Sequence, residues 1–256
     1  MKQIATIIAL LIFVTSASAE DLYKREVFVS QDGDSLQYRV LYPENIKDGE
    51  KYPLVLFLHG AGECGGDNEK QLVHGAEMFL NPVNREKYPA YVIFPQCPED
   101  KYWAFLSRPL SFAPGEMTGE KIVTPLIKSV KELVDSYINL PNIDKNRVYV
   151  IGLSMGGMAV FDLVIRFPEI FAAAVPICGA VDPSRLPSAK DVPFRIFHGD
   201  SDNVVTVENS RQAYRTLKSL GAEVEYIEFP GCNHGSWNPA FCYPDFMKWI
   251  FDRWKK

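Results

Sequence analysis

The chain has 256 residues, a formal net charge of −5 and a hydrophobic fraction of 47%. Its Lys and Arg residues are scattered, which argues against the basic surface that nucleic acids or anionic membranes require, so neither is an expected partner. A chain of this size can bury one large core, and we expect a single domain over residues 20–256.

The N-terminus has the pattern of a secretory signal peptide. Lys2 precedes an apolar stretch from Ile4 to Val14, and Ala17-Ser18-Ala19 supplies a small-residue cleavage site. The apolar stretch is shorter than the roughly 20 residues that cross a bilayer, and no later segment is long and apolar enough to insert. The sequence predicts a signal peptide over residues 1–19, cleavage near Ala19, and a periplasmic or secreted product.

The first elements after this segment are predicted strands. Tyr23–Ser30 and Leu36–Tyr42 are rich in β-forming residues and flank Asp32-Gly33-Asp34, which predicts an antiparallel hairpin with a tight turn. Leu54–Leu58 is a continuous apolar run, typical of a strand that is buried on both faces in a parallel sheet. Similar runs follow at Ala90–Phe94, Val148–Ile151, Phe171–Ile177, Phe194–Phe197 and Val224–Phe229.

Helical patterns separate these strands. Thr118–Tyr137 has apolar residues at helical spacing, and Met155–Phe167 ends before Pro168. Further helices are predicted at Gln71–Leu80, Ser210–Leu220 and Tyr243–Trp254. Strands that alternate with helices indicate an α/β domain, with a mostly parallel twisted sheet, an antiparallel N-terminal hairpin and helices on both faces.

The strongest chemical motif is Gly152-Leu153-Ser154-Met155-Gly156-Gly157, which lies between a buried strand and a helix. Small residues allow a tight turn there, and the strained serine presents its hydroxyl above the sheet edge. The helix that follows offers the free N–H of Met155 to an oxyanion. The motif predicts Ser154 as a nucleophile, with an ordinary glycine-rich turn as the alternative.

A serine nucleophile needs a histidine general base. His234 is favoured, because it lies in a glycine-flanked turn after the last strand. The competing histidines have other expected roles: His59 braces a loop, His74 lies in a helix or loop before the nucleophile, and His198 forms structural hydrogen bonds at a strand end.

The acid that orients the base should follow the strand Phe194–Phe197, where the sequence offers Asp200 and Asp202. We favour Asp202, since Asp200 lies one step from the strand end and could cap the loop instead. The order Ser154, Asp202, His234 is the one expected for a serine at such a turn.

A second oxyanion donor is expected from His59-Gly60-Ala61-Gly62-Glu63, which follows the strand Leu54–Leu58. The backbone N–H of Ala61 is the favoured donor. The alternative is a glycine-rich connection that binds no ligand.

Together these motifs resemble those of α/β hydrolases, and within that superfamily the secreted esterases near the feruloyl and acetyl xylan esterases of carbohydrate esterase family 1. The matching segments are Leu56–Glu63, Phe94–Pro98 with Trp103, Gly152–Gly157, Pro176–Gly179, His198–Val205 and Asn233–Trp237. Each segment is shared with dienelactone-hydrolase-like, phospholipase/carboxylesterase-like and prolyl-oligopeptidase-like relatives. Ala180-Val181 departs from the glycines of many relatives and leaves the shape of the acyl pocket open.

The resemblance implies an α/β-hydrolase fold and a serine esterase that removes acetyl or feruloyl groups from plant polysaccharides or their fragments. Trp103, Cys178 and Trp237 lie beside the motifs and are candidate substrate-binding residues, with core packing as the alternative. No cofactor or metal is expected, since no H-E-x-x-H or comparable cluster occurs. The alternatives are a serine peptidase of the prolyl-oligopeptidase type and a noncatalytic carbohydrate-binding protein.

Five cysteines leave the disulfide pattern open. Cys232 could bridge to Cys242, and Cys64 could bridge to Cys97. Cys178 is the fifth cysteine. The alternative to any disulfide bond is that the cysteines are buried free thiols.

Overall fold

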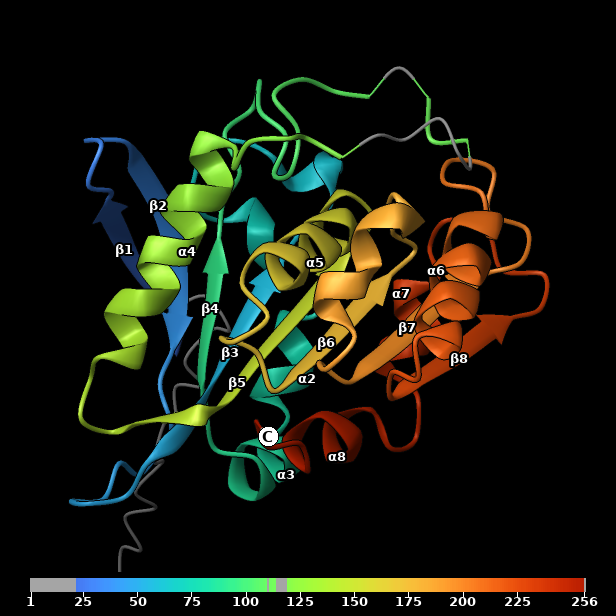
Figure 1. Ribbon diagram of the computed structural model, residues 1–256. Helices are drawn as coiled ribbons and strands as arrows, with labels where there is room; N and C mark the ends of the chain where they lie inside the picture. The colour runs from blue at the N-terminus through green and yellow to red at the C-terminus, as the bar shows by residue number, and fades with distance from the viewer. Residues whose placement is uncertain (1–21, 110, 114–118, 256) are drawn as a thin grey trace, which may run out of the picture.

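The computed structural model describes residues 22–109, 111–113 and 119–255, and it is built around one eight-stranded sheet (Figure 1). The strands follow the order β1-β2-β4-β3-β5-β6-β7-β8. Pairs β1–β2 and β2–β4 are antiparallel, and all other pairs are parallel. The strands are β1 Lys24–Val29, β2 Ser35–Leu41, β3 Tyr52–Leu58, β4 Tyr91–Pro95, β5 Ile143–Leu153, β6 Ala173–Ile177, β7 Phe194–Gly199 and β8 Val224–Phe229.

Helices cover both faces of this sheet, because successive side chains of a strand point to opposite faces. In β3, Leu54, Leu56 and Leu58 pack with α4, α5 and α6, whereas Val55 and Phe57 pack with α2, α7 and α8. Figure 1 shows α4, α5 and α6 in front of the strands. The helices are α2 Ala76–Leu80, α3 Pro82–Lys87, α4 Pro125–Ile138, α5 Met155–Arg166, α6 Glu208–Ser219, α7 Trp237–Phe241 and α8 Phe246–Phe251, with 3-10 turns at Ala61–Glu63, Lys70–Leu72 and Pro183–Ala189.

The predicted fold class is confirmed. The N-terminal hairpin pairs Lys24 with Val40 and Val29 with Ser35, and Gly33 in its turn has a φ of 88°, which favours glycine. The continuous apolar runs became strands, and β3 and β4 are buried on both faces, whereas β8 at the sheet edge is only partly buried. A mostly parallel sheet follows from these runs, since each needs cover on both sides.

Several predicted helix bounds were wrong, and proline or glycine explains each difference. The helix expected from Thr118 begins at Pro125, where the Thr124 hydroxyl accepts the N–H of Ile127 at 3.2 Å and caps the helix; Thr118 itself lies outside the described residues. The helix expected from Tyr243 begins at Phe246, after Pro244. Gly75, with a φ of 82°, divides the helix expected at Gln71–Leu80 into a 3-10 turn and α2.

The predicted signal peptide over residues 1–19 lies outside the described residues. Among the residues that are described, no helix combines the length and apolar character needed to cross a membrane. All five cysteines are free thiols in this structure.

Candidate active site

The candidate site lies where the parallel strands end, at one edge of the sheet. Gly60–Glu63 follow β3, Ser154 follows β5, Asp202 follows β7 and His234 follows β8. Because the carboxyl ends of parallel strands lie side by side, residues far apart in the sequence meet at this edge.

The turn at Ser154 places its side chain at the start of α5 in a strained conformation. Ser154 has a φ of 54° and a ψ of −118°, outside the regions that L-residues ordinarily occupy. A Cβ on Gly152 would lie 2.4 Å from the carbonyl oxygen of Gly156, and a Cβ on Gly156 would lie 2.0 Å from the carbonyl oxygen of Leu58. Glycine is therefore required at both positions for the turn to form.

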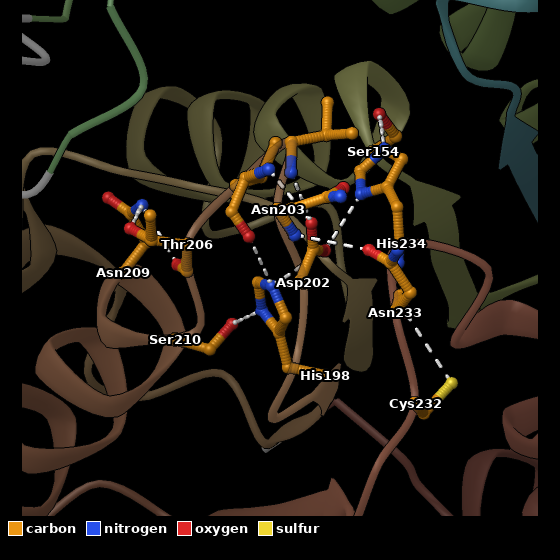
Figure 2. Close-up of polar contacts among 12 residues, drawn as sticks. Ser154, His198, Asp202, Asn203, Thr206, Asn209, Ser210, Cys232, Asn233 and His234 are labelled. Atoms are coloured by element: carbon orange, nitrogen blue, oxygen red, sulfur yellow. Dashed lines mark hydrogen bonds and ion pairs between the residues drawn. The ribbon is translucent and has the colours of Figure 1, made fainter.

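Ser154, His234 and Asp202 form one continuous chain of hydrogen bonds (Figure 2). The Ser154 Oγ lies 2.9 Å from Nε2 of His234, and Nδ1 of His234 lies 2.7 Å from Oδ2 of Asp202. His234 is partly exposed at 19%, while the carboxyl group of Asp202 is fully buried. This arrangement allows Asp202 to hold the Nδ1–H tautomer of His234, which leaves Nε2 free to accept the serine proton.

Asp202 is held by more groups than His234 alone. Its Oδ1 accepts the N–H groups of Val204 and Val205, both at 2.9 Å, and its Oδ2 lies 3.1 Å from Nε2 of His198. Burial by itself raises the pKa of Asp202, but the hydrogen bonds from His198, His234 and Val204 outweigh it, so the pKa lies well below its usual range. Asp202 therefore stays ionised.

His198 is the structural histidine that the sequence indicated, and it acts on Asp202 directly. It is completely buried, and its Nδ1 lies 2.7 Å from the hydroxyl of Ser210 (Figure 2). Its Nε2 lies 2.9 Å from the carbonyl oxygen of Val205, which can only accept. The Nε2 atom therefore carries the proton, which it shares between Val205 and Asp202, and the Ser210 hydroxyl donates to Nδ1.

The competing residues occupy other positions. Asp200 is exposed and accepts the N–H of Gly231 at 2.7 Å, so it caps the turn before His234. His59 is buried, with Nδ1 2.6 Å from the carbonyl oxygen of Gly60 and Nε2 accepting the N–H of Cys97 at 2.9 Å. Nε2 of His74 lies 3.6 Å from Oε1 of Glu63. None of these histidines contacts Ser154.

The residues that carry the expected oxyanion donors, Ala61 and Met155, line the same cavity as Ser154. The N–H groups of Ala61 and Met155 have no hydrogen-bond acceptor among the described residues. Ala61 begins a 3-10 turn whose preceding residues are fixed by the two hydrogen bonds of His59. Two unpaired backbone donors beside a serine hydroxyl form a suitable site for a negatively charged oxygen.

A cavity of about 280 Å³ opens above Ser154. Its aromatic walls come from Tyr102, Phe112 and Trp237, and a small apolar cluster that includes Met158 and Val205 packs against Phe112. The lining residues are Gly60–Glu63, Tyr102, Arg108, Phe112, Leu153–Met155, Met158, Val204, Val205, His234 and Trp237. The site can therefore hold an apolar or aromatic group next to the serine.

The three candidate substrate-binding residues differ in position. Trp237 lines the cavity, and its ring lies edge-on to His234 with centroids 5.5 Å apart. Trp103 is fully buried, its indole N–H donates to the carbonyl oxygen of His59 at 3.1 Å, and it does not line the cavity. Cys178 is fully buried as well and is absent from the lining.

Within the part of the chain that the structure describes, one group of side chains could hold a metal ion, formed by Cys178, Asp202 and His234. Their donor chemistry fits a hydrogen-bonded triad better. Nδ1 of His234 is engaged by Asp202, and burial raises the pKa of the Cys178 thiol, so that it stays protonated and is a poor metal ligand.

Several cavity residues were missed by the sequence analysis. Tyr102, Arg108 and Phe112 come from residues 101–113, where the described residues form no helix or strand (green trace at the top of Figure 1). Arg108 is exposed and forms no ion pair among the described residues. Glu63 also lines the cavity, and its buried Oε2 has no hydrogen-bond partner there. No periodic pattern marks such positions; only the unusual local density of aromatic residues does.

Residues 45–243 match the family model described as Phospholipase/Carboxylesterase. The chain belongs to this family. The protein is therefore a carboxylic ester hydrolase with the α/β-hydrolase fold. The finer resemblance to carbohydrate esterase family 1 stays a prediction.

Curated relatives and solved structures agree with this family. A probable carboxylesterase of Oryza sativa subsp. japonica is 27% identical over 79% of this chain and 88% of its own. Carboxylesterase SOBER1 of Arabidopsis thaliana is 26% identical over 78% of this chain and 90% of its own. A crystal structure of a thermostable esterase matches with a TM-score of 0.80 and 37% identity over 92% of this chain. This chain covers 64% of that esterase, which is therefore the longer protein.

Proposed function

We propose that this hydrolase cleaves its ester through a covalent acyl-enzyme in which Ser154 is the nucleophile, His234 the general base and Asp202 the acid that orients it. The single observation that carries this proposal is the unbroken path from Ser154 Oγ through His234 to Asp202, with hydrogen bonds of 2.9 and 2.7 Å. A serine hydroxyl is a weak nucleophile on its own and becomes competent when such a base removes its proton.

In the first half of the reaction, Nε2 of His234 accepts the Ser154 proton while Oγ bonds to the ester carbonyl carbon. The ionised Asp202 stabilises the imidazolium that forms. The carbonyl oxygen becomes an oxyanion, and we assign its stabilisation to the N–H groups of Ala61 and Met155, each worth about 3 kcal/mol in comparable sites. His234 then returns the proton to the departing alkoxide oxygen, and the acyl group stays on Ser154.

In the second half, a water molecule takes the place of the alcohol. His234 accepts its proton as the water oxygen attacks the acyl carbon, and the same two N–H groups receive the second oxyanion. The bond to Oγ breaks, Ser154 regains its proton from His234, and the carboxylic acid leaves.

Covalent labelling with a fluorophosphonate probe tests the nucleophile. The probe should attach to Ser154 in the folded wild-type protein, and peptide mass spectrometry should locate the adduct there. A folded protein that never labels would contradict the proposal and favour a noncatalytic carbohydrate-binding role. Labelling of another serine would reject Ser154.

For the substrate, we infer acetyl or feruloyl esters of plant polysaccharides or their fragments. The motif resemblance supports this class, and so does a cavity of about 280 Å³ with aromatic side chains from Tyr102, Phe112 and Trp237 beside Ser154. Aromatic walls suit the flat faces of a ferulate ring or of a sugar. Export by the predicted signal peptide over residues 1–19 would bring the enzyme to such polymers.

Product analysis on acetylated and feruloylated xylan fragments separates the possible acyl groups. We expect release of acetate or ferulate, and a parallel series of p-nitrophenyl esters should show the tolerated acyl length. Hydrolysis of short p-nitrophenyl esters without release from either xylan would overturn the polysaccharide substrate and leave the esterase chemistry intact.

A further inference from the structure

Two cysteines lie where the loop that carries Ala61 meets the segment after β4. Cys64 directly follows the 3-10 turn Ala61–Glu63, and Cys97 follows β4 by two residues. The N–H of Gly65 donates to the carbonyl oxygen of Cys97 at 2.9 Å, and the side-chain amide of Gln96 donates to the carbonyl oxygen of Glu63 at 3.3 Å. The two backbone segments are thus held side by side.

The two thiols face the same point. Sγ of Cys97 lies 3.4 Å and Sγ of Cys64 lies 4.0 Å from the carbonyl oxygen of Lys101. The other cysteines show no such pairing. Cys242 is exposed, and Sγ of Cys232 contacts the carbonyl oxygen of the neighbouring residue.

We propose that Cys64 and Cys97 are a site of oxidative modification, at which a small disulfide or a disulfide-bearing oxidoreductase converts the two thiols into an intramolecular disulfide bond. This inference is independent of the proposed reaction and substrate. It rests on the contact that both sulfur atoms make with the carbonyl oxygen of Lys101 and on the hydrogen bonds that hold the two backbone segments together.

The difference in exposure between the two thiols sets the order of the exchange. Cys97 is fully buried, whereas Cys64 is partly exposed and can meet an oxidant. The neighbouring Cys97 thiol lowers the pKa of the Cys64 thiol against the opposing effect of burial, whereas the Cys64 thiol and burial both raise the pKa of Cys97. The Cys64 thiolate is therefore the first nucleophile.

With oxidised glutathione, the exchange balances in two steps. The Cys64 thiolate attacks one glutathione sulfur and breaks the glutathione disulfide, so that one glutathione leaves as a thiolate and takes up a proton. Cys97 then loses its proton and attacks the Cys64 sulfur of the mixed disulfide, which releases the second glutathione. Two protein thiols are oxidised, and one oxidised glutathione is reduced to two thiols.

The crosslink would join the oxyanion loop covalently to the segment that also holds His59 through the N–H of Cys97. It constrains the unfolded chain between residues 64 and 97, so the thermal midpoint should rise by about 5 °C or more. Turnover should change less than about twofold, because hydrogen bonds hold the loop in place before oxidation.

Thiol counting on the folded full-length protein tests the pairing. After incubation with oxidised glutathione, alkylation should find at least two fewer free thiols than in the reduced protein, since the exposed Cys242 can also form a mixed disulfide, and digestion should yield one peptide that links Cys64 to Cys97. Five free thiols after this treatment, or a link between other cysteines, would overturn the proposal. A linked protein with an unchanged thermal midpoint would overturn the claim that the loop is constrained.

Two single substitutions test the order of attack. In Cys97→Ser, Cys64 should retain one glutathione as a stable mixed disulfide, while in Cys64→Ser the buried Cys97 should stay unmodified. Modification of Cys97 in the second variant would reject Cys64 as the entry point. Cys242→Ser is the matched control and should form the Cys64–Cys97 link as the wild type does; the wild-type measurement decides the proposal if either variant fails to fold.

Discussion

The triad and the cavity wall are built in different ways. Ser154, Asp202 and His234 follow the ends of β5, β7 and β8, and hydrogen bonds join their side chains to one another. Tyr102, Arg108 and Phe112 lie on residues 101–113, outside any helix or strand that the structure describes. The sheet thus fixes the proposed catalytic side chains, whereas the loop shapes the wall of the cavity beside them.

This difference separates two kinds of effect. A change at the sheet edge should reduce turnover of every ester, because it removes chemistry that all of them need. A change in the wall should alter the ranking of esters and leave the common chemistry in place. The predictions below test this division, from the largest effect to the smallest.

Ser154→Ala should lower kcat by at least about 10⁴-fold for all esters, since the nucleophile is lost. The thermal midpoint should stay close to that of the wild type, because the backbone turn does not depend on the hydroxyl. Initial rates on a short p-nitrophenyl ester, with a melting curve of the same sample, provide the measurement. Substantial residual turnover would reject Ser154 as the nucleophile.

Asp202→Asn should lower kcat by about 10³- to 10⁴-fold, since the neutral amide cannot hold the productive tautomer of His234 or stabilise its charged form. The matched control is Asp200→Asn, which removes the cap of a turn and should lower kcat by less than about fivefold. Both are measured as kcat at saturating substrate. A larger loss in the control would make Asp200 the acid.

Stability should fall between about pH 6.5 and about pH 4.5 because of His59. Burial lowers the pKa of His59 to about 4 from its ordinary 6.5, so the unfolded chain binds a proton in this range and the folded chain does not. The full loss is about 3 kcal/mol in the free energy of unfolding. Denaturant titrations at several pH values should show the slope.

His59→Gln is the control and should flatten that slope. Asp202 affects the stability of the fold at lower pH than His59 does. Its pKa in the folded protein is depressed, so it stabilises the fold above its ordinary pKa of about 4, and this stabilisation is lost as the pH falls further. A wild-type protein equally stable at both ends of the window would contradict the neutral, buried role of His59.

His198→Gln should lower kcat about tenfold with little change in KM, because Asp202 loses one of its hydrogen-bond donors. Ser210→Ala removes the hydroxyl that hydrogen-bonds to Nδ1 of His198, and it should lower kcat by less than His198→Gln does. Steady-state kinetics below the melting range provide the test. A lower thermal midpoint with unchanged kcat would assign His198 a purely structural role.

Phe112→Ala should have the smallest effect, about threefold in kcat/KM, and the loss should be greater for an aromatic ester than for an acetate. Leu106→Ala is the matched control, since Leu106 lies on the same segment, is 56% exposed and does not line the cavity. Equal losses on both esters would break the proposed division between chemistry and selectivity.

What could be predicted from the sequence follows the same division. The strained turn at Ser154 could be predicted, because a tight turn between a buried strand and a helix needs glycines at fixed spacing, which is a local pattern. The positions of Asp202 and His234 after strand ends could be predicted, because strand ends can be read from apolar runs. The first residues of α4 and α8 were predicted wrongly. Helix α4 begins at Pro125, and Pro244 delays the start of α8 to Phe246.

The cavity wall could not be predicted, because its residues share no period. Trp103 and Trp237 both lie beside motifs, yet Trp103 is fully buried and Trp237 lines the cavity. Their environments depend on the placement of the described residues 101–109 and 111–113. That placement is set by tertiary contacts such as the hydrogen bond from Asn209 to the carbonyl oxygen of Phe112, which joins positions far apart in the sequence.

The close approach of Gly156 to the carbonyl oxygen of Leu58 bears on the evolution of this enzyme. The distance between the two proposed oxyanion donors is set by a contact between backbone atoms, at Leu58, three residues before Ala61, and at Gly156, one residue after Met155. Side chains around the site can drift over many generations without changing that distance. A single methyl group at Gly156 would push the donors apart, so selection should hold this glycine as firmly as the serine.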